Sequence, residues 1–127
     1  MNNLKNSLLL SIVLFSLTLA QPINVKIIVK AEGVENSESV YIAGNMQAIG
    51  NWNPGNKKFT KESDGSWVFS FTMPKAAQLE FKFTKGSWSQ EAANSDGTVP
   101  GNTFVDIVRD TVLEYKICCW SKNGGTT

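Results

Sequence analysis

The chain has 127 residues and carries 12 lysines and arginines against 11 aspartates and glutamates, with no histidine. This balance leaves no basic excess to neutralise phosphates, so we do not expect nucleic acid as a partner. The lack of histidine removes the usual general base at neutral pH, the Ser-His and Cys-His nucleophile pairs and the commonest zinc ligand.

Residues 1–20 are predicted to be a secretory signal peptide. Lys5 precedes an apolar run from Leu8 to Ala20, which is shorter than the roughly 20 residues that a bilayer span needs. Small residues, Thr18 and Ala20, occupy the positions that a signal peptidase reads. The alternative, a retained membrane anchor, fits this length and these flanks less well. We therefore expect cleavage near Ala20 and a secreted, extracellular product without a membrane span.

The rest of the chain shows an apolar repeat of two residues nearly everywhere and no helical period of useful length. Residues 21–120 suit one domain, and residues 121–127 are predicted to form a flexible polar tail. In "SWVFSFTM" and "LEFKF", large apolar side chains alternate with smaller or polar ones. Strands are therefore expected, in chain order, at residues 23–31, 38–44, 57–61, 66–73, 78–85, 103–108 and 111–120.

These short strands, separated by turn signals, predict an all-β fold, a single immunoglobulin-like antiparallel β-sandwich of about seven or eight strands. Trp67 is in phase with Phe69 and Phe71, which favours a place in the core or at its edge. Trp120 ends the last strand and is expected to pack against the sheet. The predicted centre of the sandwich contains Phe69, Phe71, Leu79, Phe81, Phe83, Tyr115 and Ile117.

Cys118 and Cys119 are adjacent in the last predicted strand. Neighbouring side chains of a strand point to opposite faces, so we expect one buried and one exposed thiol rather than a disulfide between them. A bridge to another molecule through the exposed thiol stays open as an alternative. Two cysteines without a histidine do not favour a metal site, and we expect neither a metal nor a cofactor.

Two tryptophans lie in loops instead of strands. The loop "AGNMQAIGNWNPG" carries Trp52 among glycines and asparagines, and "SWSQEAANSDGTVPGN" carries Trp88. Burial stabilises tryptophan strongly, so either the loop packs its ring over the open end of the sandwich or an external ligand covers it. Lys82, on the outward face of the strand before Trp88, is either an ordinary solvated lysine or a hydrogen-bond donor beside the rings.

Four motifs in order, "VYIAGNMQAIGNWNP", "SWVFSFTMP", "LEFKF" and "SW", resemble the starch-binding domains of carbohydrate-binding module family 20 and the related glycogen-binding modules. The resemblance covers residues 38–120. It implies that Trp52 and Trp88 form the twin stacking platform of the family's main sugar site, with Lys82 as its lysine donor. Asn102 stands where the family has the asparagine of a P-N-R motif, although the loop before it is longer here and Thr103 replaces the arginine.

Some members of that family have a second sugar site, built from tyrosines in two other loops and the tryptophan that matches Trp67. The corresponding loops of this chain, "EGVENS" and "TKESDG", contain no aromatic residue. We therefore expect the second site to be absent.

The sequence as a whole predicts a secreted, non-catalytic module that binds α-glucan, such as starch or glycogen, at Trp52, Lys82, Trp88 and Asn102. The alternative is a secreted β-sandwich that binds another protein through the same aromatic loops, without sugar binding. An enzyme is not expected, because among the carboxylates only Asp106 lies within an apolar strand run, and alternation turns it toward solvent or a sheet edge.

The usual context of the family is a linked catalytic domain, and no such domain is recognised in this sequence. Three roles stay open at this point. The chain can act beside separate glucan-active enzymes, display itself on a surface, or be a remnant of a larger protein.

Overall fold

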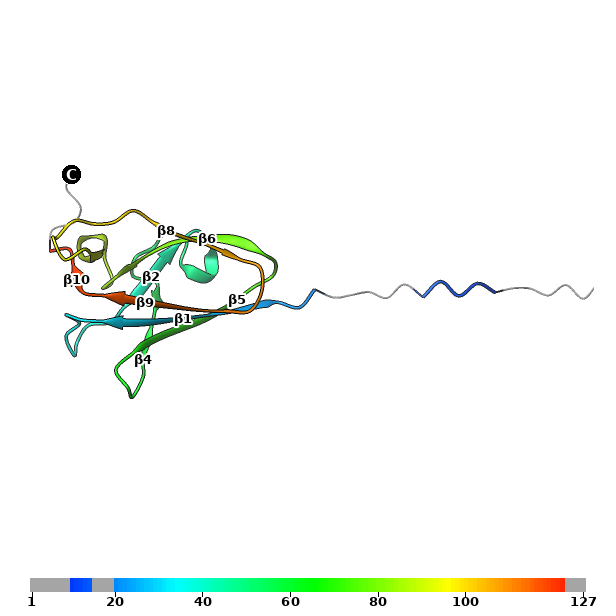
Figure 1. The fold of residues 1–127 in the computed structure, drawn as a ribbon, viewed down its shortest axis with the longest axis horizontal. Coiled ribbons are helices and arrows are strands. Elements are labelled where there is room, and N and C mark those ends of the chain that lie inside the picture. Colours follow the sequence, from blue (N-terminus) through cyan, green and yellow to red (C-terminus); the bar gives the residue numbers. More distant parts are fainter. Residues whose placement is uncertain (1–9, 15–19, 123–127) are drawn as a thin grey trace, which may run out of the picture.

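The computed structural model describes residues 10–14 and 20–122 (Figure 1). Most of the predicted leader, residues 1–9 and 15–19, lies outside the described residues, as do residues 123–127 of the predicted tail. Within the described ranges, no helix is long and apolar enough to cross a membrane.

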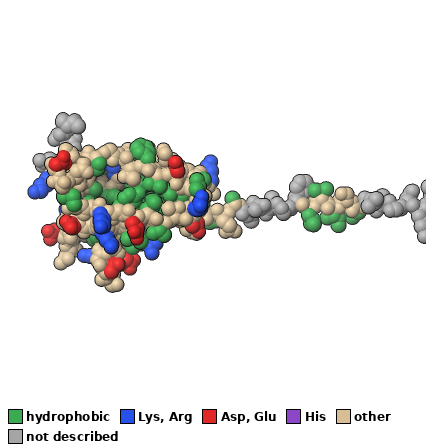
Figure 2. All heavy atoms as spheres, in the orientation of Figure 1, with side chains coloured by type: hydrophobic (Ala, Val, Ile, Leu, Met, Phe, Trp, Pro, Cys, Tyr) green, Lys and Arg blue, Asp and Glu red, His purple; other side chains and the backbone are tan. Residues whose placement is uncertain are grey.

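The strands form two four-stranded sheets, which lie as two layers in Figure 1 with hydrophobic side chains in a band between them (Figure 2). One sheet has the strand order β4 (Thr60–Lys61), β5 (Trp67–Met73), β1 (Ile23–Ala31) and β9 (Thr111–Ile117). The other has the order β3 (Lys57–Lys58), β2 (Tyr41–Gly44), β6 (Ala77–Thr84) and β8 (Thr103–Ile107). The prediction of an all-β sandwich is confirmed.

Four short elements complete the fold. A two-stranded ladder joins β7 (Ala92–Ala93) to β10 (Cys119–Trp120). Two 3-10 helices, η1 (Gln47–Ile49) and η2 (Trp88–Gln90), interrupt the two loops that carry the tryptophans. The sequence pattern did not predict β7, η1 or η2, because each is only two or three residues long and shows no period. β10 lies within the strand predicted at residues 111–120.

One strand pair departs from the predicted antiparallel arrangement. β1 and β9 run parallel, in a register that pairs Val25 with Thr111 and Ala31 with Ile117. β8 and β9 are consecutive, but they belong to different sheets. The turn at Arg109 and Asp110 therefore passes from one layer to the other instead of closing a hairpin, and β9 reaches β1 in the same direction.

The predicted strand 57–61 is divided at Phe59. β3 pairs with β2 in one sheet, and β4 pairs with β5 in the other, so the chain changes sheets at this residue. Phe59 is buried, and its ring centroid lies 5.4 Å from that of Phe69 and 5.8 Å from that of Phe83. Phe59 therefore links the two layers.

The predicted core residues lie in one hydrophobic cluster. Leu79, Phe81 and Ile117 are buried with Phe83, while Phe69, Phe71 and Tyr115 are half-buried and pack against them. Trp67 is only 5% exposed, which confirms its predicted place in the core. Trp120 packs against the cluster as predicted, and its indole Nε1 donates to the carbonyl oxygen of Glu32 at 2.7 Å.

The prediction of two separate thiols was wrong. Cys118 and Cys119 form a disulfide with each other, and no free cysteine remains in the described residues. β9 ends at Ile117 and β10 begins at Cys119, so Cys118 belongs to no strand. The two side chains are therefore not held on opposite faces of one continuous strand, which was the basis of the prediction.

Candidate functional site

The four predicted site residues line one hollow of about 440 Å³ on the outer side of the β3-β2-β6-β8 sheet. They come from three separate loops and from β6. Two carboxylates that the sequence argument did not assign to the site complete the wall. The lining residues are Trp52, Glu80, Lys82, Trp88, Glu91 and Asn102.

Lys82 is held in place by an ion pair. On β6 it alternates with the buried Phe81 and Phe83, so its side chain leaves the sheet on the outer face. Its ammonium Nζ lies 3.2 Å from Glu91 Oε1, and the two side chains are 21% and 11% exposed. An ammonium has three N–H donors, and this contact uses one of them. The lysine is thus oriented before any ligand arrives.

Asn102 is oriented by the second carboxylate. Its amide Nδ2 donates a hydrogen bond of 2.7 Å to Glu80 Oε1, across the ladder between β8 and β6. A hydrogen bond to a carboxylate is stronger than one between neutral groups. The amide oxygen and the second N–H of Asn102 take no part in the bond to Glu80.

The Trp52 loop is anchored from below by Ile49. This residue ends η1 and is fully buried. It packs against Gly44 so closely that a Cβ at that position would collide with Ile49 Cδ1. The backbone N–H of Trp52 then donates to the Gly44 carbonyl oxygen at 2.9 Å. Burial of a complete isoleucine side chain contributes roughly 1.5–3 kcal/mol, which offsets part of the entropy cost of ordering the loop.

The backbone at Trp52 is in the left-handed region. Gly50, Asn51 and Trp52 have φ values of 94°, 46° and 62°, and only the first of them is a glycine. A left-handed conformation costs roughly 1–2 kcal/mol for a residue with a Cβ, and asparagine tolerates it better than tryptophan does. Such strain persists where the surrounding contacts determine the backbone, and it is concentrated at functional sites. The result is a tryptophan that is half-buried and faces the hollow.

Trp88 begins η2 and is 38% exposed. Its loop is joined to the Trp52 loop through Thr84, the last residue of β6, which is fully buried. Thr84 Oγ1 donates to the Pro54 carbonyl oxygen at 2.7 Å and accepts from the Gly86 N–H at 3.0 Å. One hydroxyl therefore sets the spacing between the two loops.

The same two loops touch backbone to backbone. A Cβ on Gly55 would lie 2.8 Å from the carbonyl oxygen of Gly86, so a larger residue would force the loops apart. Alternation along β6 puts Thr84 on the outer face with Glu80 and Lys82. Its burial cannot be read from the sequence, because it arises only where the loops fold over it. The two glycines were visible in the sequence, but their contact was not.

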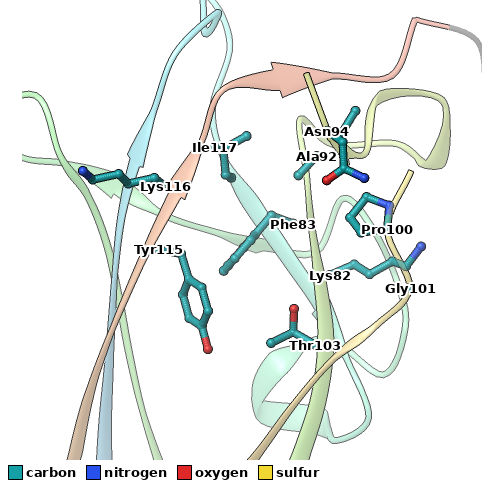
Figure 3. Close-up of a pocket in the computed structure, with 11 residues that line it drawn as sticks. Lys82, Phe83, Ala92, Asn94, Pro100, Gly101, Thr103, Tyr115, Lys116 and Ile117 are labelled. Atoms are coloured by element: carbon teal, nitrogen blue, oxygen red, sulfur yellow. The ribbon is translucent and has the colours of Figure 1, made fainter. Parts of the chain in front are cut away.

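A second cavity, of about 170 Å³, lies on the inner side of β6 between the sheets. In Figure 3, Tyr115 lies on one side of Phe83 and Pro100 on the other. Burial raises the pKa of the Tyr115 hydroxyl above its usual value of 10.0. Its lining mixes apolar side chains with Asn94, Thr103 and Lys116, and of the four predicted site residues it includes only Lys82.

Two half-exposed indoles, a fixed lysine and a fixed amide thus line one hollow on the outer face of the β-sandwich. The family model described as the starch binding domain matches residues 22–103 of this chain. The chain therefore belongs to the starch-binding domain family, and carbohydrate binding is its function in the broad sense.

Solved structures share the fold. The family 20 carbohydrate-binding module of a maltotetraose-forming amylase from Pseudomonas saccharophila STB07 is 22% identical, with a TM-score of 0.55, covering 75% of this chain and 100% of that one. A family 15 glucoamylase from Hypocrea jecorina is 15% identical, with a TM-score of 0.59, covering 81% of this chain and 18% of the glucoamylase. At these identities the likeness describes the fold alone.

A curated relative is an amylopullulanase of Thermoanaerobacter thermohydrosulfuricus, which is 28% identical over 87 residues. The match covers 68% of this chain but only 6% of the relative. This chain is thus similar to a small part of a much longer enzyme.

Proposed function

We propose that this module binds α-glucan, such as starch or glycogen, by stacking sugar rings on Trp52 and Trp88. The observation that carries the proposal is that both indoles, Lys82 and Asn102 line one hollow, although they are up to 50 residues apart in the sequence. The relatives that are named for amylolytic activity support an α-linked glucose polymer as the ligand.

The apolar face of a pyranose ring lies flat on an indole, and the ring hydroxyls at its edge then meet polar side chains. If each indole loses on the order of 50–100 Å² of apolar surface, each contact contributes roughly 1–2.5 kcal/mol. The cost of immobilising the ligand leaves an expected affinity in the micromolar to millimolar range, about −4 to −8 kcal/mol. Lys82 and Asn102 supply the hydrogen bonds that fix the orientation of the sugar.

The site is arranged for binding before the ligand arrives. The ion pair from Glu91 holds Lys82, the carboxylate of Glu80 holds Asn102, and Thr84 holds the two loops together. Side chains that are already ordered lose less entropy when the sugar binds. This is why a small contact area can still give measurable affinity.

We propose further that the module is not catalytic. A glycosidase needs one carboxyl that stays protonated as a general acid, usually in an apolar setting, and a second that stays ionised. Both carboxylates of the hollow instead accept contacts from the site's own polar side chains, Glu91 from Lys82 and Glu80 from Asn102. Their role in this proposal is to position these two donors.

Export through the predicted leader, residues 1–20, belongs to the same proposal, with the module acting outside the cell beside separate glucan-active enzymes. The disulfide between Cys118 and Cys119 supports an oxidising compartment. N-terminal sequencing of the protein from the culture medium tests this part. A mature chain that begins near Gln21 is expected, and an intact leader on the recovered protein would contradict it.

Cosedimentation with insoluble starch, cellulose and chitin tests the ligand. The wild type is expected to pellet with starch alone, while folded Trp52→Ala and Trp88→Ala variants stay in the supernatant. Lys26→Ala, on the opposite sheet, is the control that should pellet like the wild type. A wild type that pellets with none of the polymers, or folded tryptophan variants that still pellet with starch, would contradict the proposal.

A further inference from the structure

Phe104 is an aromatic side chain that the fold leaves exposed outside the hollow. It is 56% exposed, although it belongs to the strand β8. Among the described residues, the largely exposed aromatic side chains are Trp88 and Phe104. Trp88 already belongs to the proposed sugar site, so the position of Phe104 relative to that site decides what its exposure means.

The register of the sheet places Phe104 next to the hollow. β8 pairs antiparallel with β6, and Phe104 lies directly opposite Glu80, which lines the hollow. Directly opposite side chains have Cβ atoms about 4.5–5.5 Å apart, and diagonal ones about 7–8 Å apart. Phe104 therefore lies directly beside Glu80 and diagonal to Lys82, on the same outer face.

The polar groups around Phe104 are fixed as well. Gln78 Nε2 donates to Asp106 Oδ1 at 3.1 Å, in the cross-strand pair just beyond Phe104. On the other side of the ring, Asn102 Nδ2 donates to Glu80 Oε1 at 2.7 Å. An exposed phenyl ring thus has ordered amide and carboxylate groups on either side. This combination suits a sugar ring, which needs an apolar platform and hydrogen-bonding partners at its edge.

β8 is also an edge strand of its sheet. Exposed apolar residues on an edge strand favour pairing with other chains, and charged residues are the usual protection. The exposed Asp106 protects β8 in this way, whereas the exposed Phe104 favours pairing with another chain. A ligand that covers the ring explains the exposed phenyl group without invoking the core.

We propose that Phe104 is a further stacking position for the same α-glucan chain, immediately beyond the hollow formed with Trp52 and Trp88. The inference rests on the proposed function and extends it to a dependence of affinity on the length of the glucan chain. Short oligosaccharides occupy the two indoles, Lys82 and Asn102. A longer chain continues over Glu80 to Phe104, where the Gln78–Asp106 pair meets its hydroxyls. The module consequently prefers longer chains.

Isothermal titration with maltotriose and with maltoheptaose tests this inference. Phe104→Thr removes the ring and keeps a residue that suits a strand, while Phe104→Tyr keeps the ring. Val112→Thr, at an exposed apolar position of β9 on the other sheet, is the matched control. Phe104→Thr is expected to weaken maltoheptaose binding about three- to tenfold and to leave maltotriose binding within about twofold. Phe104→Tyr and Val112→Thr should bind both ligands like the wild type.

Other results would overturn the inference. If Phe104→Thr leaves both affinities unchanged, Phe104 does not contact the sugar, and the proposed function itself survives. An equal loss for both ligands would place Phe104 in the primary site or in the fold, and not in an extension. If the wild type binds neither oligosaccharide, the proposed function fails, and the inference fails with it. Should Phe104→Thr not fold, an unaltered preference for maltoheptaose in a folded Phe104→Gln variant would contradict the inference in the same way.

Discussion

The tryptophan loops and the strand β5 both carry tryptophan, but the loops leave it accessible and the strand buries it. In β5, Trp67 is 5% exposed and contributes to the core, with Lys61 Nζ 5.6 Å from the centroid of its ring. In the loops, Trp52 takes a left-handed backbone and stays half-buried, and Trp88 is 38% exposed. All three residues are tryptophans, so their different exposure comes from the backbone conformation and not from hydrophobicity. A strand turns every second side chain toward the core. The loops are instead held by buried residues beneath them, which leaves their tryptophans accessible.

This comparison separates stability from binding. The core tryptophan should affect mainly the free energy of unfolding, and the loop tryptophans should affect mainly the affinity for sugar. Residues that connect the two regions should affect both.

The largest effect is expected for Trp67→Ala. Deleting a buried tryptophan side chain leaves a cavity and costs about 3–5 kcal/mol of unfolding free energy. Trp88→Ala, at an exposed position, should cost no more than about 1 kcal/mol. Urea denaturation followed by circular dichroism measures both. A greater loss of stability for Trp88→Ala than for Trp67→Ala would reverse the assignment of the two regions.

Thr84→Val should be next in size, because it preserves shape and removes the hydroxyl that joins the two loops. Leaving the Pro54 carbonyl and the Gly86 N–H without this partner costs about 1–3 kcal/mol of stability. The Kd for maltoheptaose should rise about tenfold, which corresponds to about 1.4 kcal/mol. Titration calorimetry on the folded variant measures the change. Unaltered affinity would show that Thr84 does not set the spacing of the indoles.

Gly55→Ala tests the same spacing through steric contact. The new methyl group would meet the Gly86 carbonyl oxygen at 2.8 Å, so the loops must separate. We expect a loss of about 1–3 kcal/mol in unfolding free energy, together with weaker sugar binding. Gly101→Ala is the control, since a Cβ there meets nothing within 4 Å. Equal behaviour of the two variants would contradict the close approach of the loops.

The smallest effect concerns pH. The pKa of the Glu38 carboxyl is lowered below its usual value of 4.5. The main cause is the hydrogen bond that it accepts from the Glu35 N–H, and the second is its contact with Lys85. The stability that this carboxylate contributes is present above its unfolded pKa and is lost as pH falls through its folded pKa. Glu38→Gln should therefore be slightly less stable than the wild type at pH 7, and the difference should vanish in acid. Unfolding curves between pH 7 and pH 3 measure it, and a difference that grows toward pH 3 would give the wrong sign.

Sequence reasoning located the strands well because alternation depends only on neighbouring residues. The predicted strand 23–31 coincides with β1, and the strand predicted at 66–73 begins one residue before β5. The same reasoning failed where the chain changes direction. Phe59 crosses between the sheets, and the break at Cys118 allows the disulfide with Cys119.

The four site residues predicted from the sequence line one hollow, but the groups that hold them in place were not predicted. Trp52 and Trp88 stand out in a sequence because large aromatic residues are rare in loops rich in glycine and asparagine. Glu80, Glu91 and Thr84 do not stand out, because a carboxylate or a hydroxyl on a strand face is usually solvated. Their partners lie between 2 and 30 residues away in the sequence, and only the folded chain brings them together.

The most direct test of the central claim follows the indole N–H signals of the four tryptophans by NMR during a titration with maltoheptaose. The core tryptophans serve as internal controls, since Trp67 is buried and Trp120 donates to a backbone carbonyl. The signals of Trp52 and Trp88 are expected to shift together along one binding curve, while those of Trp67 and Trp120 stay in place. Binding that leaves the Trp52 and Trp88 signals unmoved would show that the sugar lies elsewhere on the module.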